Sequence, residues 1–132
     1  MSKASIPIPD ELNRISGSIV DAAIKVHKEL GPGLLEKVYE ACLAHELEKR
    51  GLRVERQVEQ GVIYDGVVLD SGFKLDLLVE SAIIVELKAV ETLLPVHSAQ
   101  ILTYLRLSDL RLGLLMNFNV SLLKDGILRF VR

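Results

Sequence analysis

IIVELKA, residues 83–89, is an apolar run that encloses one acid, Glu86, and one lysine, Lys88. A second acid, Asp76, lies within a similar run, LDLLV, at residues 75–79. Runs of this length and composition are typical of buried β-strands. Charged side chains are rarely buried unless they are paired, bind a metal or take part in chemistry. Two consecutive apolar strands that contain three charges therefore predict both the centre of a sheet and a functional site.

The connection between the two runs determines how their charges face each other. Residues 80–82 are the least strand-like in between, so we expect a tight antiparallel hairpin centred on Ser81. This register places Asp76 directly opposite Glu86, with Cβ atoms roughly 4.5–5.5 Å apart. Two carboxylates at that distance repel each other unless a cation lies between them or one is protonated. Because side chains alternate along a strand, Lys88 projects from the same face as Glu86.

These residue types suit a metal site that acts on phosphate. Asp76 and Glu86 would be hard oxygen ligands for Mg²⁺ or Mn²⁺, and the backbone carbonyl of Leu87 could add another. A metal there would polarise a phosphoryl oxygen and ionise a bound water, while Lys88 would orient that water or neutralise charge on phosphorus. The alternative is a buried ion pair of Lys88 with one of the acids. Such a pair returns little net stability after desolvation.

The composition describes an ordinary globular chain of 132 residues, 49% hydrophobic and 26% charged. That length suits one domain, which we place at residues 10–132 after a proline-containing lead-in at residues 1–9. The formal net charge of −2 counts against a broad basic face for nucleic acid. Cys42 is the only cysteine, which excludes an intramolecular disulfide and fits a reducing compartment. Without a membrane-length apolar run or a signal-peptide core, we expect a soluble cytoplasmic protein.

Hydrophobic periodicity predicts an alternation of helices and strands along the rest of the chain. Helices are expected at residues 10–30, 34–50 and 95–108, and strands at residues 52–64, 67–79, 83–89, 113–118 and 127–131. Asp65-Gly66 is a strong signal for the turn between the first two strands. Helices that cover both faces of a mixed sheet give a three-layer α/β/α sandwich, which is the fold class that we predict.

Two helices carry further polar candidates. Glu36 lies near the start of the second helix, where an acid is also stabilised simply by the helix dipole. Gln100 and Tyr104 are four residues apart and so share one face of the third helix, although such faces are usually just solvated. The apolar positions of that helix, which we expect to face the core, are Ile101, Leu102, Leu105 and Leu107.

Several segments together are similar to a known family. They are GxxExxY at residues 33–39, Asp76, ELK at residues 86–88, QILTY at residues 100–104 and GLLMNF at residues 113–118. In this order they resemble the PD-(D/E)XK nuclease superfamily, and more closely its GxxExxY family. The resemblance covers about residues 10–131 and implies a restriction-endonuclease-like core of the order αβββαβ. Leu75 stands where the superfamily motif has its proline.

The resemblance also assigns roles. It implies that Asp76 and Glu86 bind the metal, that Glu36 helps to hold the metal or water, and that Lys88 is the catalytic lysine. Gln100 and Tyr104 would contact substrate phosphates or support the site. The implied activity is a Mg²⁺- or Mn²⁺-dependent nuclease that hydrolyses phosphodiester bonds, in DNA rather than RNA, and a homodimer would enlarge its grip on a duplex. The alternatives are a non-catalytic nuclease-fold module that binds nucleic acid or a partner protein, and a hydrolase of a smaller phosphate ester.

Overall fold

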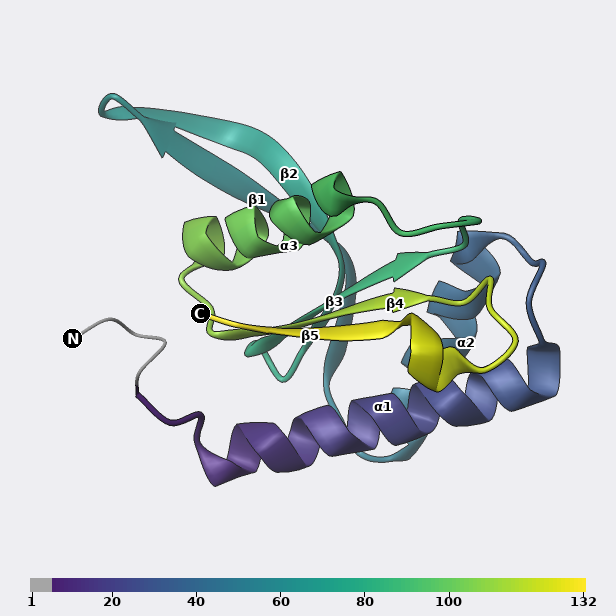
Figure 1. The fold of residues 1–132 in the computed structure, drawn as a ribbon. Helices are drawn as coiled ribbons and strands as arrows, with labels where there is room; N and C mark the ends of the chain where they lie inside the picture. Colours follow the sequence, from purple (N-terminus) through teal and green to yellow (C-terminus); the bar gives the residue numbers. More distant parts are fainter. Residues whose placement is uncertain (1–5) are drawn as a thin grey trace.

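The computed structural model describes residues 6–132, so the first five residues of the predicted lead-in lie outside the described part. Three helices flank a five-stranded sheet (Figure 1). The helices are α1 (Asp10–Leu30), α2 (Glu36–Lys49) and α3 (Pro95–Ser108). The strands are β1 (Val54–Tyr64), β2 (Val67–Val79), β3 (Ile83–Lys88), β4 (Leu112–Asn117) and β5 (Ile127–Val131), with a short 3-10 helix, η2 (Leu123–Gly126), before β5.

The sheet is mixed, and its strands follow the order of the chain from β1 to β5. Only the pair β3–β4 is parallel, because α3 lies between these strands in the chain and returns it to the same end of the sheet. This arrangement, with helices on both faces, confirms the predicted α/β sandwich.

Each face of the sheet has its own hydrophobic core. Under α1 and α2, side chains such as Ile19 and Leu43 pack against Val85 of β3. Under α3, Ile101 and Leu105 pack against Ile84. The strand β3 therefore buries alternate side chains in the two cores, as its nearly continuous apolar sequence predicts. None of the helices in residues 6–132 is both long and apolar enough to cross a bilayer.

The second helix begins at Glu36, two residues later than its apolar pattern predicts. The hydroxyl group of Tyr39 donates to Gly31 O at 2.6 Å and accepts the N–H of Leu34 at 3.1 Å, and so holds the preceding loop outside the helix. Leu35 is consequently exposed. The Tyr39 ring stacks on Phe118 at 4.6 Å between centroids, which ties this loop to the end of β4.

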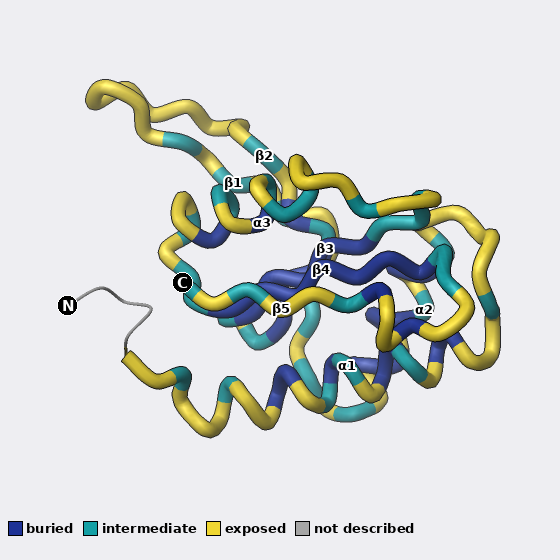
Figure 2. Tube along the Cα trace, viewed as in Figure 1, coloured by how far each residue is buried: buried dark blue, intermediate teal, exposed yellow. Residues whose placement is uncertain are grey.

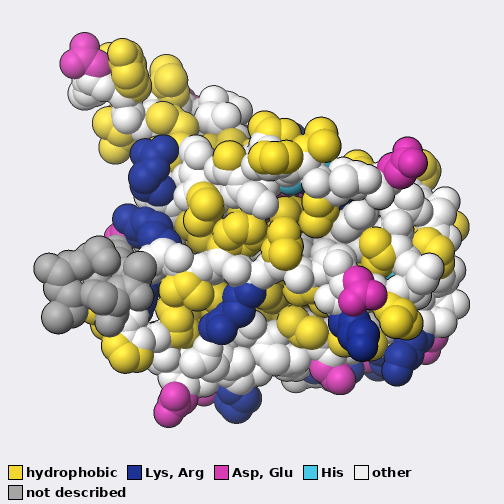
Figure 3. Space-filling view, in the orientation of Figure 1, with side chains coloured by type: hydrophobic (Ala, Val, Ile, Leu, Met, Phe, Trp, Pro, Cys, Tyr) yellow, Lys and Arg dark blue, Asp and Glu magenta, His cyan; other side chains and the backbone are white. Residues whose placement is uncertain are grey.

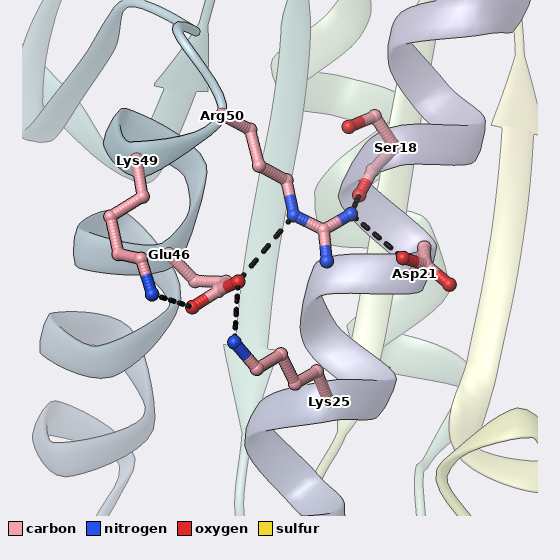
Figure 4. A network of polar contacts seen from close by, with 6 residues as sticks. All are labelled: Ser18, Asp21, Lys25, Glu46, Lys49 and Arg50. Atoms are coloured by element: carbon pink, nitrogen blue, oxygen red, sulfur yellow. Dashed lines mark hydrogen bonds and ion pairs between the residues drawn. The ribbon is translucent and has the colours of Figure 1, made fainter.

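A network of ion pairs joins α1 to α2 on the outer side of this layer (Figure 4). Arg50 Nη1 donates to Asp21 Oδ2 at 2.8 Å, and Lys25 Nζ donates to Glu46 Oε1 at 3.1 Å. The hydrogen bond from Lys25 is the main cause of the lowered pKa of Glu46, and Lys49 adds its charge. These contacts, including the one made by Lys25, hold the two helices side by side.

The hairpin of β1 and β2 projects beyond the rest of the molecule (Figure 1). Its turn at Asp65 and Gly66 has positive φ values of 50° and 76°, as the sequence signal predicts. The register shifts between Gln60 and Val62, whose partners on β2 are Phe73 and Leu69. Gly72 allows this shift, because a Cβ atom there would lie 2.2 Å from the Val62 side chain. We call residues 61–71 the arm, and most of its residues are exposed (Figure 2).

Candidate active site

The strands β2 and β3 separate at the two predicted acids. Their ladder runs through the pair Val79–Ile83 to the pair Leu77–Val85, which is the register expected for a hairpin centred on Ser81. Continued by one residue, this register brings Asp76 opposite Glu86. At this point, hydrogen bonds to the side chains of the two acids take the place of main-chain hydrogen bonds between the strands.

Both acids make hydrogen bonds across this gap. Asp76 Oδ2 accepts the backbone N–H of Leu87 at 2.9 Å, and the backbone N–H of Asp76 donates to Glu86 Oε1 at 3.3 Å. The two carboxyl groups are therefore fixed next to each other by the backbone of the opposite strand. Their positions depend on strand geometry and not on a loop.

Burial and the neighbouring carboxylate together perturb Glu86. The residue is only 4% exposed. Burial is the main cause that raises the pKa of Glu86 to about 9, the charge of Asp76 and a hydrogen bond with it add to this, and the charge of Lys88 opposes it. At neutral pH and without a cation, Glu86 therefore holds a proton. It would release this proton to solvent when a metal ion binds. Strongly shifted carboxyl groups of this kind are typical of active sites.

A stacked pair of aromatic rings, one of them from α3, lies near the two acids. The ring of Tyr104 stacks on Phe73 of β2, with centroids 4.4 Å apart and planes 15° from parallel. Burial raises the pKa of the Tyr104 hydroxyl, and the negative charges of Glu86 and Asp76 raise it further. The phenol therefore lies within electrostatic range of both carboxyl groups and, like any tyrosine, can donate a hydrogen bond at neutral pH.

A second buried acid, which the sequence analysis missed, reaches the site from the opposite helical layer. Glu40 of α2 is buried and accepts hydrogen bonds from Arg56 at 3.0 and 3.1 Å. The side-chain amide of Gln57 donates to Glu40 Oε1 at 2.5 Å and to Asp76 Oδ1 at 3.4 Å. Gln57 thus connects the two acids, and its φ of 50° is unusual for a non-glycine residue.

The sequence model of the PD-(D/E)XK nuclease superfamily matches residues 13–130. The chain belongs to this superfamily. No curated protein and no solved structure matches it. The matched region includes every candidate residue described above, and PD-(D/E)XK nucleases generally use divalent metals. Membership therefore supports a nuclease-type fold for this chain.

The donor set that this PD-(D/E)XK chain presents is small. Within residues 6–132, no group of three or more His, Cys, Asp and Glu side chains is gathered closely enough to hold a metal ion. Asp76 and Glu86 provide two carboxylates. The N–H and C=O of a residue in an extended strand point to the same side. The N–H of Leu87 points to Asp76 on β2, so the carbonyl of Leu87 also points into the gap between β2 and β3. Hard oxygen donors of this type fit Mg²⁺ or Mn²⁺, which keep several waters as ligands.

The remaining predicted residues lie on β3, α3 and α2. Lys88 follows the acids at the end of β3, half-buried. Gln100 lies one turn before Tyr104 on α3, also half-buried. Glu36 is exposed at the first residue of α2, and in the described part of the chain no hydrogen bond or ion pair joins it to Asp76 or Glu86.

The end of β3 is anchored to β4. The backbone N–H of Phe118 donates to the carbonyl of Lys88 at 2.8 Å. The buried side chain of Asn117 accepts the N–H of Val90 at 3.1 Å and donates to its carbonyl at 2.9 Å. These bonds extend the parallel pairing past the last strand residue, and so they fix the backbone from which the Lys88 side chain starts.

Proposed function

We propose that this protein is a metal-dependent nuclease that hydrolyses phosphodiester bonds, with DNA as its substrate. The observation that supports this most is the fixed pair of Asp76 and Glu86 at the gap between β2 and β3. A buried carboxyl group with a pKa of about 9 next to a second acid stabilises the fold poorly without a cation. The pair is therefore best explained by a metal ion that both acids share.

In this proposal, Asp76, Glu86 and the carbonyl of Leu87 would hold Mg²⁺ or Mn²⁺. When bound, such an ion acts as a Lewis acid on a phosphoryl oxygen and lowers the pKa of a coordinated water. The ammonium group of Lys88, on the same strand face as Glu86, would hold the attacking water and stabilise the negative charge that develops on the phosphoryl oxygens.

Residues from the flanking helices would position the substrate. The Tyr104 hydroxyl is protonated at neutral pH, as an ordinary phenol is, and its raised pKa keeps it so at higher pH, so it can donate to a phosphate oxygen. Gln100, one turn earlier on the same helix, would add an amide donor. Glu36 would orient water at the exposed start of α2. Glu40 would act less directly, because Gln57 lies between its carboxylate and Asp76.

The proposal extends to the protein's classification and setting. GxxExxY at residues 33–39 supports membership of the GxxExxY family, and the role of Tyr39 in fixing the loop before α2 gives that motif a structural reason. We further propose one nuclease domain over residues 10–132, a cytoplasmic location and a homodimer.

The test is incubation of the purified protein with single- and double-stranded DNA and RNA, in Mg²⁺, Mn²⁺ or EDTA. We expect DNA cleavage that needs the metal and is lost in Glu86→Ala and Lys88→Ala. Glu91→Ala is a matched control, because Glu91 is an exposed acid only three residues after Lys88. Nucleic-acid binding without cleavage under every condition would instead support a non-catalytic module.

A further inference from the structure

The arm exposes more apolar surface than a free hairpin should. Its largest exposed side chains are Ile63 at 74%, Tyr64 at 73%, Val68 at 66%, Val67 at 57% and Leu69 at 48%. Figures 1 and 3 show this hydrophobic segment projecting away from both cores. Two-stranded hairpins are marginally stable in water unless something packs on them. An apolar surface packed on the arm would therefore stabilise it.

Both faces of the arm are apolar. The cross-strand pairs Tyr64–Val67 and Val62–Leu69 lie on one face, and the pair Ile63–Val68 lies on the other. An antiparallel ribbon that is solvated on one side usually alternates apolar with polar residues. The arm lacks this alternation near its tip, so the pattern favours contact with another apolar surface over simple solvation.

The outer surface of α3 is a second uncovered apolar region on the same side of the molecule (Figure 3). Ile101 and Leu105 pack into the core, whereas Leu102 and Leu107, which the sequence predicted to face inward, are 44% and 41% exposed. Val96 and Leu107 are eleven residues apart and so lie on one side of the helix, Leu102 lies on its flank, and the exposed Leu94 precedes its first residue. We call these four residues the α3 surface.

The charges of the two regions are complementary. Residues 61–71 contain Asp65 and Asp70 and no lysine or arginine. The sequence of α3 contains Arg106 and no acid. A nucleic acid would require basic residues on the arm, and none are there. A positively charged apolar surface would suit the arm, and this chain carries one on α3.

We propose that the arm of one molecule packs across the α3 surface of a second copy of this chain. In a two-fold symmetric pair each molecule would both give an arm and receive one, so that a single type of contact covers all four apolar regions. The acids of the arm would then lie near Arg106 of the other molecule. This inference deepens the homodimer in the proposed function, but it does not depend on cleavage.

The experiment measures the mass of the full chain in solution by light scattering and sedimentation from about 1 to about 100 µM. We expect a dimer. Tyr64→Ser with Val67→Thr on the arm, and Val96→Ser with Leu102→Ser on α3, should each weaken dimerisation at least about tenfold. Leu128→Ser is the control, because this exposed apolar residue lies on β5, outside both regions. Circular dichroism of each variant verifies that it folds.

A charge exchange tests the pairing of arm and helix directly. Asp70→Arg and Arg106→Asp should each weaken the dimer, and the two together should restore it. A monomer at the highest concentration overturns the proposal, as do α3 variants that dimerise normally while the arm variants do not. A monomer whose arm variants lose DNA affinity would assign the arm to nucleic acid. A dimer without cleavage would contradict the proposed nuclease but leave this interface supported.

Discussion

The side chain of Asp76 accepts the backbone N–H of Leu87 at 2.9 Å, at the position where β2 and β3 stop pairing through their main chains. The carboxylate of a candidate metal ligand is thus also part of the sheet. Its two roles can be separated, because one requires only a hydrogen-bond acceptor and the other requires a negative charge.

Asparagine at position 76 should preserve the structural role and remove the metal. Asp76→Asn retains an oxygen that can accept the Leu87 N–H, whereas Asp76→Ala leaves this donor unsatisfied at a cost of about 1–3 kcal/mol in the free energy of unfolding. We expect Mg²⁺ to raise the unfolding temperature of the wild type and of neither variant. Thermal unfolding with Mg²⁺ or EDTA measures this. An equal shift in Asp76→Asn would contradict the assignment of Asp76 as a ligand.

The metal-free protein should become less stable as the pH rises. The pKa of Glu86 is about 9 in the folded protein, compared with the ordinary value of 4.5. Between these values the native state holds a proton that the unfolded chain has released, so the free energy of unfolding falls as the pH rises from about 4.5 to about 9. Urea unfolding in EDTA at several pH values measures the slope. Glu86→Gln should flatten it, and Mg²⁺ should reduce it, because the bound ion stabilises the ionised carboxylate.

Gln57 should show a conflict between stability and activity. Its φ of 50° costs about 1 kcal/mol in a non-glycine residue, while its amide joins Glu40 to Asp76. Gln57→Gly should therefore reduce cleavage while it recovers part of this strain. Gln57→Ala is the matched control, since it loses the same amide and keeps the strain. If the glycine variant cleaves at the wild-type rate, Gln57 does not position Asp76.

Lys88 should affect the chemical step more than binding. Lys88→Met retains much of the aliphatic stem and removes the charge, and we expect the maximal cleavage rate to fall at least about a hundredfold. The affinity for DNA, measured by anisotropy in Ca²⁺, should change little. Lys49→Met removes an exposed lysine from the distant α1–α2 network and should cleave normally. Comparable losses in rate and affinity would indicate that Lys88 only attracts the substrate.

The central part of the site could be predicted from sequence because its geometry is local. Once the turn lies at residues 80–82, the register of β2 and β3 follows, and it brings Asp76 to Glu86. Contacts between distant segments could not be predicted in this way. The link from Glu40 to Gln57 depends on how α2 packs against β1 and on a left-handed residue within a strand. In the sequence, Gln57 lies between Arg56 and Val58 in a segment rich in polar residues, where a solvated side chain would be expected.

The exposed side of α3 shows a second limit of predicting burial from the spacing of apolar residues. Helical spacing alone predicts that Leu102 and Leu107 face the core, but the sheet beneath α3 accommodates only Ile101 and Leu105. An apolar residue beyond the reach of one core has the same sequence signal as a residue inside it. Only the structure distinguishes them.

The Asn117 carboxamide, which binds both polar groups of Val90, separates the candidate site from the connection that follows it. The segment from Glu91 to Leu94 begins only after this clamp and ends where α3 starts. Changes at the exposed Glu91 and Thr92 should therefore leave the backbone of Lys88 in place. This short stretch is a suitable place to insert a longer loop without disturbing the candidate site.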